Sequence, residues 1–208
     1  TMRVQELGHQ VFEKDGLHLG ISLRSFRSEQ LSNSISALLT GDVTAARSAI
    51  KVIEANFPIR ITRSLSEAKA WVRAQARGSE RYGLLASSGA RRIKALGVFP
   101  SVKGNECNWF LNESTDIRSS YVLEDAASEF EIQGLELDWT VVIWGGDLIH
   151  DGTGSWKFRR FKGTNWQNIK QHSEQWFRRN AYRVLLTRAR QGMVIVVPEG
   201  DADDRTRQ

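Results

Sequence analysis

Two short segments of the sequence carry residues that suit contact with a phosphate group. Gln133, Gly134 and Glu136 stand immediately before an apolar run. Arg188 and Arg190 stand between a helical pattern and the last apolar run. In an open parallel sheet, ligands bind at strand ends and in the adjoining loops. A guanidinium group there is suited to stabilise phosphoryl charge that a neighbouring lobe presents.

The two arginines also have a simpler interpretation. Cations near the end of a helix interact favourably with the negative end of the helix dipole. Arg188 and Arg190 would then stabilise the helix that precedes the last strand and would bind no ligand.

A second candidate site mixes aromatic and basic residues within residues 156–162. Trp156, Lys157, Arg159 and Arg160 belong to a run in which rings and cations interleave. Such a run suits single-stranded nucleic acid, because bases stack on the rings, at about 1–3 kcal/mol per base, while cations neutralise phosphates. The alternative is a hairpin whose rings pack on the sheet and whose cations face outward.

A third candidate lies at an expected strand-to-helix turn. Ser87, Ser88, Arg91 and Arg92 there could hold backbone phosphates at a helix N-terminus. The overall charge is compatible with such a partner, since 29 Lys and Arg against 24 Asp and Glu give a net charge of +5 and a pI near 9.6. This excess is modest and does not by itself identify a polyanion partner.

Several kinds of catalytic site are missing from the sequence. There is no Gly-x-x-x-x-Gly-Lys-Ser/Thr loop, and no Asp-Glu pair follows an apolar strand. The chain therefore lacks the backbone cradle and lysine for β- and γ-phosphates and the hydroxyl ligand for Mg²⁺. The four histidines have no metal-ligand spacing, so we expect no metal site. No Gly-x-Ser-x-Gly elbow is present.

Composition is that of an ordinary soluble domain, with 40% hydrophobic and 25% charged residues in 208. No apolar run approaches the roughly 18 residues of a membrane span, and no secretory signal is visible. The single cysteine, Cys107, excludes an intrachain disulfide and suits a reducing compartment, so a cytoplasmic location is expected. Thr1 precedes Met2, which indicates a piece of a longer chain.

Strand patterns alternate with helical patterns, which predicts an α/β fold with a mostly parallel sheet and crossover helices. Strands are expected over residues 17–23, 58–62, 82–87, 139–144 and 193–197, and helices over residues 30–39, 43–57, 65–76, 89–96 and 174–190. The last helix is expected to end at Gly192 and to bury Trp176, Phe177, Ala181, Val184, Leu185 and Leu186. Residues 1–16 form an N-terminal segment, residues 17–198 the domain, residues 145–171 an inserted hairpin or loop, and residues 199–208 a polar tail.

Three segments resemble motifs of superfamily 1 helicases, and they occur in that family's order. Residues 23–25, Leu-Arg-Ser, resemble motif IV; residues 134–136, Gly-Leu-Glu, resemble motif V; and residues 185–190, Leu-Leu-Thr-Arg-Ala-Arg, resemble motif VI. The fuller strings, residues 22–27, 129–139 and 180–193, are similar to the Schlafen group 3-like DNA/RNA helicase domain. The likeness extends over residues 17–204.

The resemblance implies the C-terminal, second RecA-like lobe of such a helicase, with a three-layer fold. It assigns Arg188 as an arginine finger for the γ-phosphate and Arg24 as a second phosphate-contacting arginine. Gly134 and Glu136 would contact the nucleotide, with Arg190 close by, while Gln133 replaces a residue that is often lysine in the family.

Because the phosphate-binding loop is missing, the resemblance also implies that ATP and Mg²⁺ are held mainly by an N-terminal RecA-like lobe. That lobe and single-stranded DNA or RNA are the expected partners, and this chain alone is not expected to hydrolyse ATP. The alternative is a non-catalytic module that binds nucleic acid or protein and retains the fold.

Overall fold

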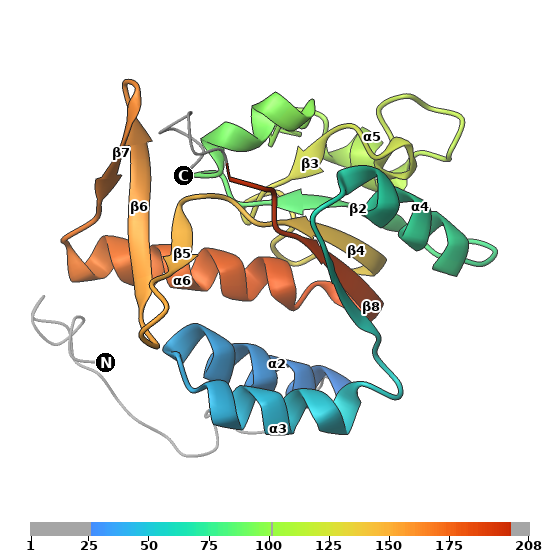
Figure 1. The fold of residues 1–208 in the computed structure, drawn as a ribbon. Coiled ribbons are helices and arrows are strands. Elements are labelled where there is room, and N and C mark those ends of the chain that lie inside the picture. The colour runs from blue at the N-terminus through green and yellow to red at the C-terminus, as the bar shows by residue number, and fades with distance from the viewer. Residues whose placement is uncertain (1–25, 101, 201–208) are drawn as a thin grey trace, which may run out of the picture.

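A five-stranded parallel sheet lies at the centre of the described part of the chain, which is residues 26–100 and 102–200 of a computed structural model (Figure 1). The strand order is β1-β8-β4-β2-β3, and every pairing is parallel. The strands are β1 (Ile59–Thr62), β2 (Tyr82–Ala86), β3 (Ala126–Ala127), β4 (Leu137–Ile143) and β8 (Ala189–Val196). The expected parallel sheet is confirmed.

Helices cover both faces of this sheet, which gives the three layers of a RecA-like fold. Leu85, Met193 and Ile195 pack in one cluster with α2, α3 and α6, while Leu84 and Val194 pack in another with α4 and η2. Successive side chains of a strand point to opposite faces of the sheet, so neighbouring residues of one strand belong to different clusters. The helices are α2 (Phe26–Thr40), α3 (Val43–Ile53), α4 (Leu65–Gln75), α5 (Glu106–Leu111), α6 (His172–Leu186) and the 3₁₀ helices η2 (Arg91–Leu96) and η3 (Ser120–Val122).

Two helix starts follow directly from their capping residues. The Asp42 carboxylate accepts a hydrogen bond from the Ala45 amide at 2.9 Å and begins α3. Ser64 Oγ accepts from the Glu67 amide at 3.2 Å and begins α4. Each side chain accepts from a backbone amide that has no partner within the first turn of the helix. The predicted starts of α3 and α4 are confirmed.

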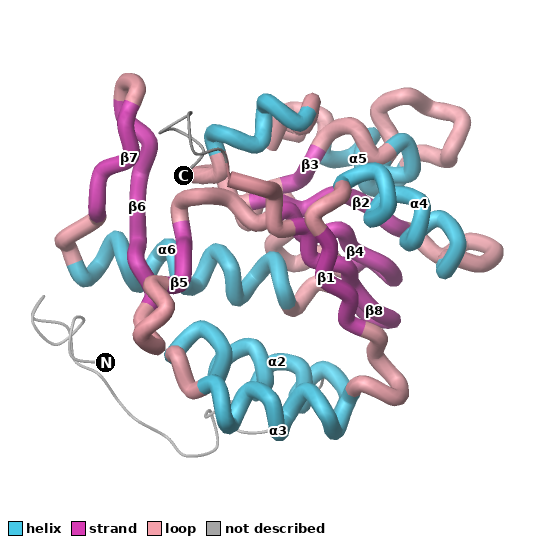
Figure 2. Tube along the Cα trace, viewed as in Figure 1, coloured by secondary structure: helices cyan, strands magenta, loops and turns pink. Residues whose placement is uncertain are grey.

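An antiparallel three-stranded sheet lies between β4 and α6 along the chain, where a hairpin or loop was expected (Figure 2). Its strands are β5 (Leu148–His150), β6 (Trp156–Lys162) and β7 (Asn165–Asn168). The β6–β7 hairpin stands beside the N-terminal end of α6, away from β1 (Figure 1). This small sheet therefore extends the molecule at one end of the central sheet.

The helix expected over residues 174–190 ends earlier than predicted. α6 begins at His172 and ends at Leu186, and β8 begins at Ala189. Gly192 was expected to end the helix, but it lies inside β8, opposite Trp139 of β4. A Cβ atom on Gly192 would lie 2.7 Å from the Trp139 ring and 2.8 Å from the Pro58 carbonyl oxygen. Gly192 is therefore required by close packing.

Replacing Gly192 by alanine is expected to lower the free energy of unfolding by about 1–3 kcal/mol, because the added methyl overpacks a contact made partly by backbone. Urea denaturation measures the change. Arg190→Ala, an exposed position of the same strand, is the control and is expected to change stability by about 0.5 kcal/mol or less. Equal midpoints for the two variants would contradict the packing account.

The buried side of α6 also differs from the prediction. Trp176 and Phe177 were expected to be buried, but they are 58% and 63% exposed and contact each other edge to face. Tyr182, Leu185 and Leu186 are fully buried, as α6 meets the sheet through them.

Some expectations concern residues outside the described ranges. These are the N-terminal segment 1–16, the strand over residues 17–23, Arg24, and residues 201–208 of the tail. Within the described ranges, no helix is both long enough and apolar enough to cross a bilayer.

Candidate functional site

The two segments predicted to contact phosphate meet at the amino edge of the central sheet, where β4 and β8 begin. The Leu137 amide donates to the Arg188 carbonyl oxygen at 3.0 Å, and Leu137 pairs with Ala189. Gly134 and Glu136 precede β4 and are exposed, and Gly134 has a φ of +87°, which favours glycine. Residues 133–136 and 188–190, which are distant in sequence, thus lie beside each other at this edge.

The Arg188 side chain lies against the end of α6 and is 8% exposed. Its Nε donates to the Val184 carbonyl oxygen at 3.2 Å, and its Nη2 to Thr187 Oγ1 at 3.4 Å. A cation beside the last carbonyls of a helix is favourable to the helix dipole. In this conformation Arg188 has the contacts expected from the helix-end interpretation, and it must turn outward to reach a phosphate beyond the edge.

The neighbouring predicted residues are more accessible. Arg190 is exposed, and its Nη1 lies 3.9 Å from Asp138 Oδ1. The other oxygen of the Asp138 carboxylate accepts from the Arg81 amide at 2.8 Å, which joins the starts of β2 and β4. Gln133 is exposed in the turn before β4. The edge therefore presents both cations and carboxylates to solvent.

These residues fit the phosphates of a nucleotide better than they fit a metal ion. Guanidinium groups bind phosphate oxygens in a fixed fork geometry. In residues 26–100 and 102–200, no three His, Cys, Asp or Glu side chains come close enough together to hold a metal ion. No Mg²⁺ site is therefore assigned to the described residues.

The carboxyl edge of the sheet holds a buried polar network that sequence patterns did not reveal. Asp147 is fully buried, accepts from Ser87 Oγ at 2.7 Å and from Tyr182 Oη at 2.7 Å, and pairs with Arg178 Nη1 at 2.9 Å. Arg178 also donates to Ser87 Oγ at 2.8 Å. The network joins β2, the loop after β4 and α6.

The Tyr182 hydroxyl remains a hydrogen-bond donor in this network at neutral pH. Burial and the adjacent Asp147 carboxylate raise the pKa of its hydroxyl well above the ordinary value. The same oxygen accepts from the Gly145 amide at 3.0 Å. The phenol therefore stays protonated at neutral pH and ties α6 to the loop after β4.

The two serines predicted to hold phosphates are already bound to carboxylates. Ser87 is buried in the network around Asp147, and Ser88 donates its amide and its hydroxyl to Glu129 at 2.9 and 2.6 Å. The Glu129 carboxylate thus already accepts the Ser88 amide and hydroxyl that were predicted to bind a phosphate. Arg91 is exposed at the start of η2.

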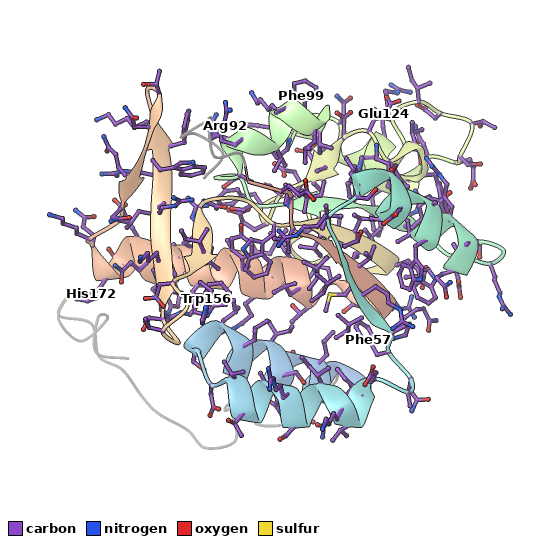
Figure 3. The ribbon with its side chains drawn as sticks, in the orientation of Figure 1. Phe57, Arg92, Phe99, Glu124, Trp156 and His172 are labelled. Carbon is purple, nitrogen blue, oxygen red and sulfur yellow. The ribbon has the colours of Figure 1, made fainter. Side chains whose placement is uncertain are left out.

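The aromatic and basic residues of β6 divide between its two faces. On one face, Trp156 stacks on Trp144 with ring centroids 5.6 Å apart and donates from Nε1 to the Leu38 carbonyl oxygen at 3.0 Å. On the same face, Arg160 lies 3.4 Å from Glu174 of α6. These contacts match the packed-hairpin alternative for Trp156, whose position at the base of β6 is labelled in Figure 3.

The other face of β6 carries Lys157 and Arg159. Lys157 is exposed. Arg159 Nε donates to the Gly146 carbonyl oxygen at 2.8 Å, and its guanidinium carbon lies 4.8 Å from the centre of the Trp166 ring. Burial lowers the pKa of Arg159 from its usual high value. This face combines cations with an aromatic ring from the adjacent strand, β7.

No curated protein matches the sequence. The family model described as Schlafen group 3, DNA/RNA helicase domain, matches residues 3–199. That match covers nearly the whole chain and includes both edges of the sheet described above, and it agrees with the family suggested by residues 134–136 and 185–190. The chain belongs to the Schlafen group 3 DNA/RNA helicase domain family.

Proposed function

We propose that this chain acts as the second motor lobe of an ATP-dependent DNA/RNA helicase or translocase. The observation that carries the proposal is the meeting of residues 133–136 and 188–190 at one edge of the sheet, joined by the hydrogen bond from Leu137 to Arg188. Family membership supports a helicase role in general. The amino edge would then face a nucleotide gripped by an N-terminal RecA-like lobe.

Each residue of the amino edge has a role in the proposed cycle. Bound ATP supplies the phosphoryl bond whose hydrolysis drives the cycle. Arg188 leaves the Val184 carbonyl and extends to the γ-phosphate, where its guanidinium stabilises the developing charge. Glu136 accepts hydrogen bonds from the ribose region, and exposed Arg190 adds positive potential. Arg24 is proposed as a second phosphate-contacting arginine.

The nucleic-acid strand is proposed to bind at the opposite, carboxyl edge. Lys157 and Arg159 lie on one face of β6 and Arg160 on the other, and Arg91 adds a further exposed cation from η2. Phosphate contacts of this kind make binding weaken steeply as salt rises. The lobe would thus place nucleotide and strand at opposite ends of one sheet, with α6 running between them.

A second candidate function is a non-catalytic module that binds nucleic acid or protein. The observation that favours it is the inward conformation of Arg188, which is 8% exposed and bound to the end of its own helix. A side chain used only to stabilise α6 would have these contacts. The two candidates differ in whether the arginine ever leaves the helix.

The test compares ATP hydrolysis by this chain with hydrolysis by a protein that joins it to the N-terminal lobe. The chain alone is expected to release no phosphate from ATP, with or without single-stranded nucleic acid, because it lacks the phosphate-binding loop. The two-lobed protein is expected to hydrolyse ATP, and to lose that activity in an Arg188→Ala variant. Turnover by the purified chain, or full activity of the variant, would contradict the proposal.

A further inference from the structure

A pocket of about 230 Å³ opens at the carboxyl edge of the central sheet, beside the network around Asp147. It lies between η2, the loop after β4, and the β6–β7 hairpin. Figure 3 shows Arg92 between η2 and that hairpin. The walls are mostly apolar and include Ile93, Leu96, Trp144, Ile149 and Val197. Arg92 and Arg159 were predicted as phosphate contacts, but the sequence did not predict the pocket or its apolar walls.

The wall of the pocket is held in place before any ligand binds. Trp144 donates from Nε1 to the Leu148 carbonyl oxygen at 2.7 Å and packs against Trp156 and Tyr182. Arg159 is fixed by Gly146 and by the Trp166 ring. A preformed wall lowers the conformational cost of binding.

The charge around the pocket is positive. Arg92 and Arg159 belong to its lining, and Glu199 is the single carboxylate among the lining residues that the structure describes. Exposed cations continue this charge on both sides, with Lys94 on η2 and Lys157 on β6. Such a surface attracts a polyanion and favours a ligand whose phosphates remain outside the apolar part.

The size of the pocket restricts the ligand further. Pockets for drug-sized molecules measure roughly 300–1,000 Å³, so this one suits a single planar ring system and not a whole nucleotide cofactor. Apolar and aromatic walls suit the face of a base, and arginines at the mouth suit the phosphates on either side of it.

We propose that this pocket receives one unstacked nucleobase of a bound single strand, whose neighbouring phosphates contact Arg92 and Arg159. The inference rests on the nucleic-acid binding in the proposed function and adds a specific base-holding site to it. A strand held in this way is fixed in register on the lobe, and not only attracted by charge.

The test fills the pocket without removing any of its contacts. Ala95 is exposed on η2 and lines the pocket, so Ala95→Phe is expected to block it while the fold remains intact. Ala45→Phe makes the same change at an exposed position of α3, which does not line the pocket. Binding of a fluorescent single-stranded oligonucleotide to the full chain is measured by anisotropy, and circular dichroism verifies folding of each variant.

Ala95→Phe is expected to raise the Kd about 5- to 100-fold, whereas Ala45→Phe leaves it unchanged. An oligonucleotide of the same length with abasic sites is expected to bind the unaltered chain about as weakly as the normal strand binds Ala95→Phe. The abasic oligonucleotide is expected to bind Ala95→Phe with the same Kd as it binds the unaltered chain. Arg159→Gln should weaken binding more than Arg160→Gln, because Arg160 lies on the other face of β6.

Three results would overturn the proposal, and only the last of them also contradicts the proposed nucleic-acid binding. If the normal and abasic strands bind equally well, or if Ala95→Phe binds as the unaltered chain does, the pocket holds no base and the proposed nucleic-acid binding still stands. If no single strand binds the chain at low salt, the pocket proposal and the nucleic-acid part of the proposed function both fail.

Discussion

Replacing Asp147 by alanine is expected to lower the free energy of unfolding by about 3–5 kcal/mol. The carboxylate is fully buried and neutralises Arg178 at 2.9 Å, while Ser87 and Tyr182 each donate to it at 2.7 Å. Its removal leaves a charged guanidinium and two hydroxyl groups without their acceptor, in a place that water reaches poorly. A loss of this size is a large part of the stability of an ordinary domain.

Chemical denaturation at neutral pH measures this loss, and Glu174→Ala is the matched control. Glu174 is also a carboxylate paired with an arginine, Arg160 at 3.4 Å, but both side chains are exposed. Exposed pairs contribute about 0.2–1 kcal/mol, so the control should cost far less. If Asp147→Ala proves too unstable to purify, Asp147→Asn keeps the shape of the side chain and permits the same comparison. Equal losses of unfolding free energy for Asp147→Ala and Glu174→Ala would contradict the role assigned to the buried carboxylate.

A double variant distinguishes the buried pair from simple loss of packing. Asp147→Leu combined with Arg178→Met removes both charges and leaves no uncompensated ion. The double variant is expected to be less destabilised than the sum of the two single variants, because each single change leaves its partner charged and buried. An additive result would mean that the ion pair contributes little.

In the two-lobed protein, Arg188→Ala is expected to lower kcat for ATP hydrolysis about 10³- to 10⁵-fold, the range for loss of an arginine finger. Steady-state phosphate release measures the change. Arg190→Ala is the control, because Arg190 is exposed, lies two residues from Arg188, and has its Nη1 3.9 Å from Asp138 Oδ1. We expect it to retain activity within about tenfold.

Arg188→Lys separates the two interpretations of this arginine. Lysine keeps a positive charge near the end of α6, so a role limited to the helix dipole predicts normal stability and normal turnover. A finger that needs the planar fork of a guanidinium predicts normal stability and strongly reduced turnover. Normal turnover in Arg188→Lys would therefore favour the non-catalytic module.

The elements of the central sheet could be predicted because their signals are local. Asp42 and Ser64 begin helices through hydrogen bonds to amides three residues later. The apolar runs that became β2 and β4 are short and continuous, as expected for strands that are covered on both faces. These patterns need no knowledge of distant residues, which is why the α/β fold follows from them.

Ala181, Leu185 and Leu186 of α6 are buried as predicted, but the burial predicted for Trp176 and Phe177 was wrong because distant partners decide the packing of this helix. Arg178 and Tyr182 share one side of the helix with Leu185, and Arg178 faces inward because Asp147 neutralises it. With that side occupied, the 3.6-residue period puts Trp176 and Phe177 on the opposite, exposed side. A pattern of apolar residues alone assigns the two rings to the core and the arginine to solvent.

The end of α6 was missed for a similar reason. Residues 189–192 contain nothing that breaks a helix before Gly192, yet Ala189 pairs with Leu137 of β4. Pairing with a neighbouring strand outweighs local helix propensity here. The meeting of the two phosphate-contacting segments depends on this pairing, so the sequence indicates both segments and the sheet brings them together.

The position of β8 has a consequence for how the protein is made. Among the strands of residues 26–100 and 102–200, β8 comes last in sequence, but it lies between β1 and β4 near the middle of the sheet. During synthesis, β1 and β4 emerge from the ribosome well before the strand that must join them. Until β8 follows, each has an unfilled edge that can pair with another nascent chain. Productive folding of this domain therefore waits for β8 (Ala189–Val196), and chains cut short before Ala189 should aggregate.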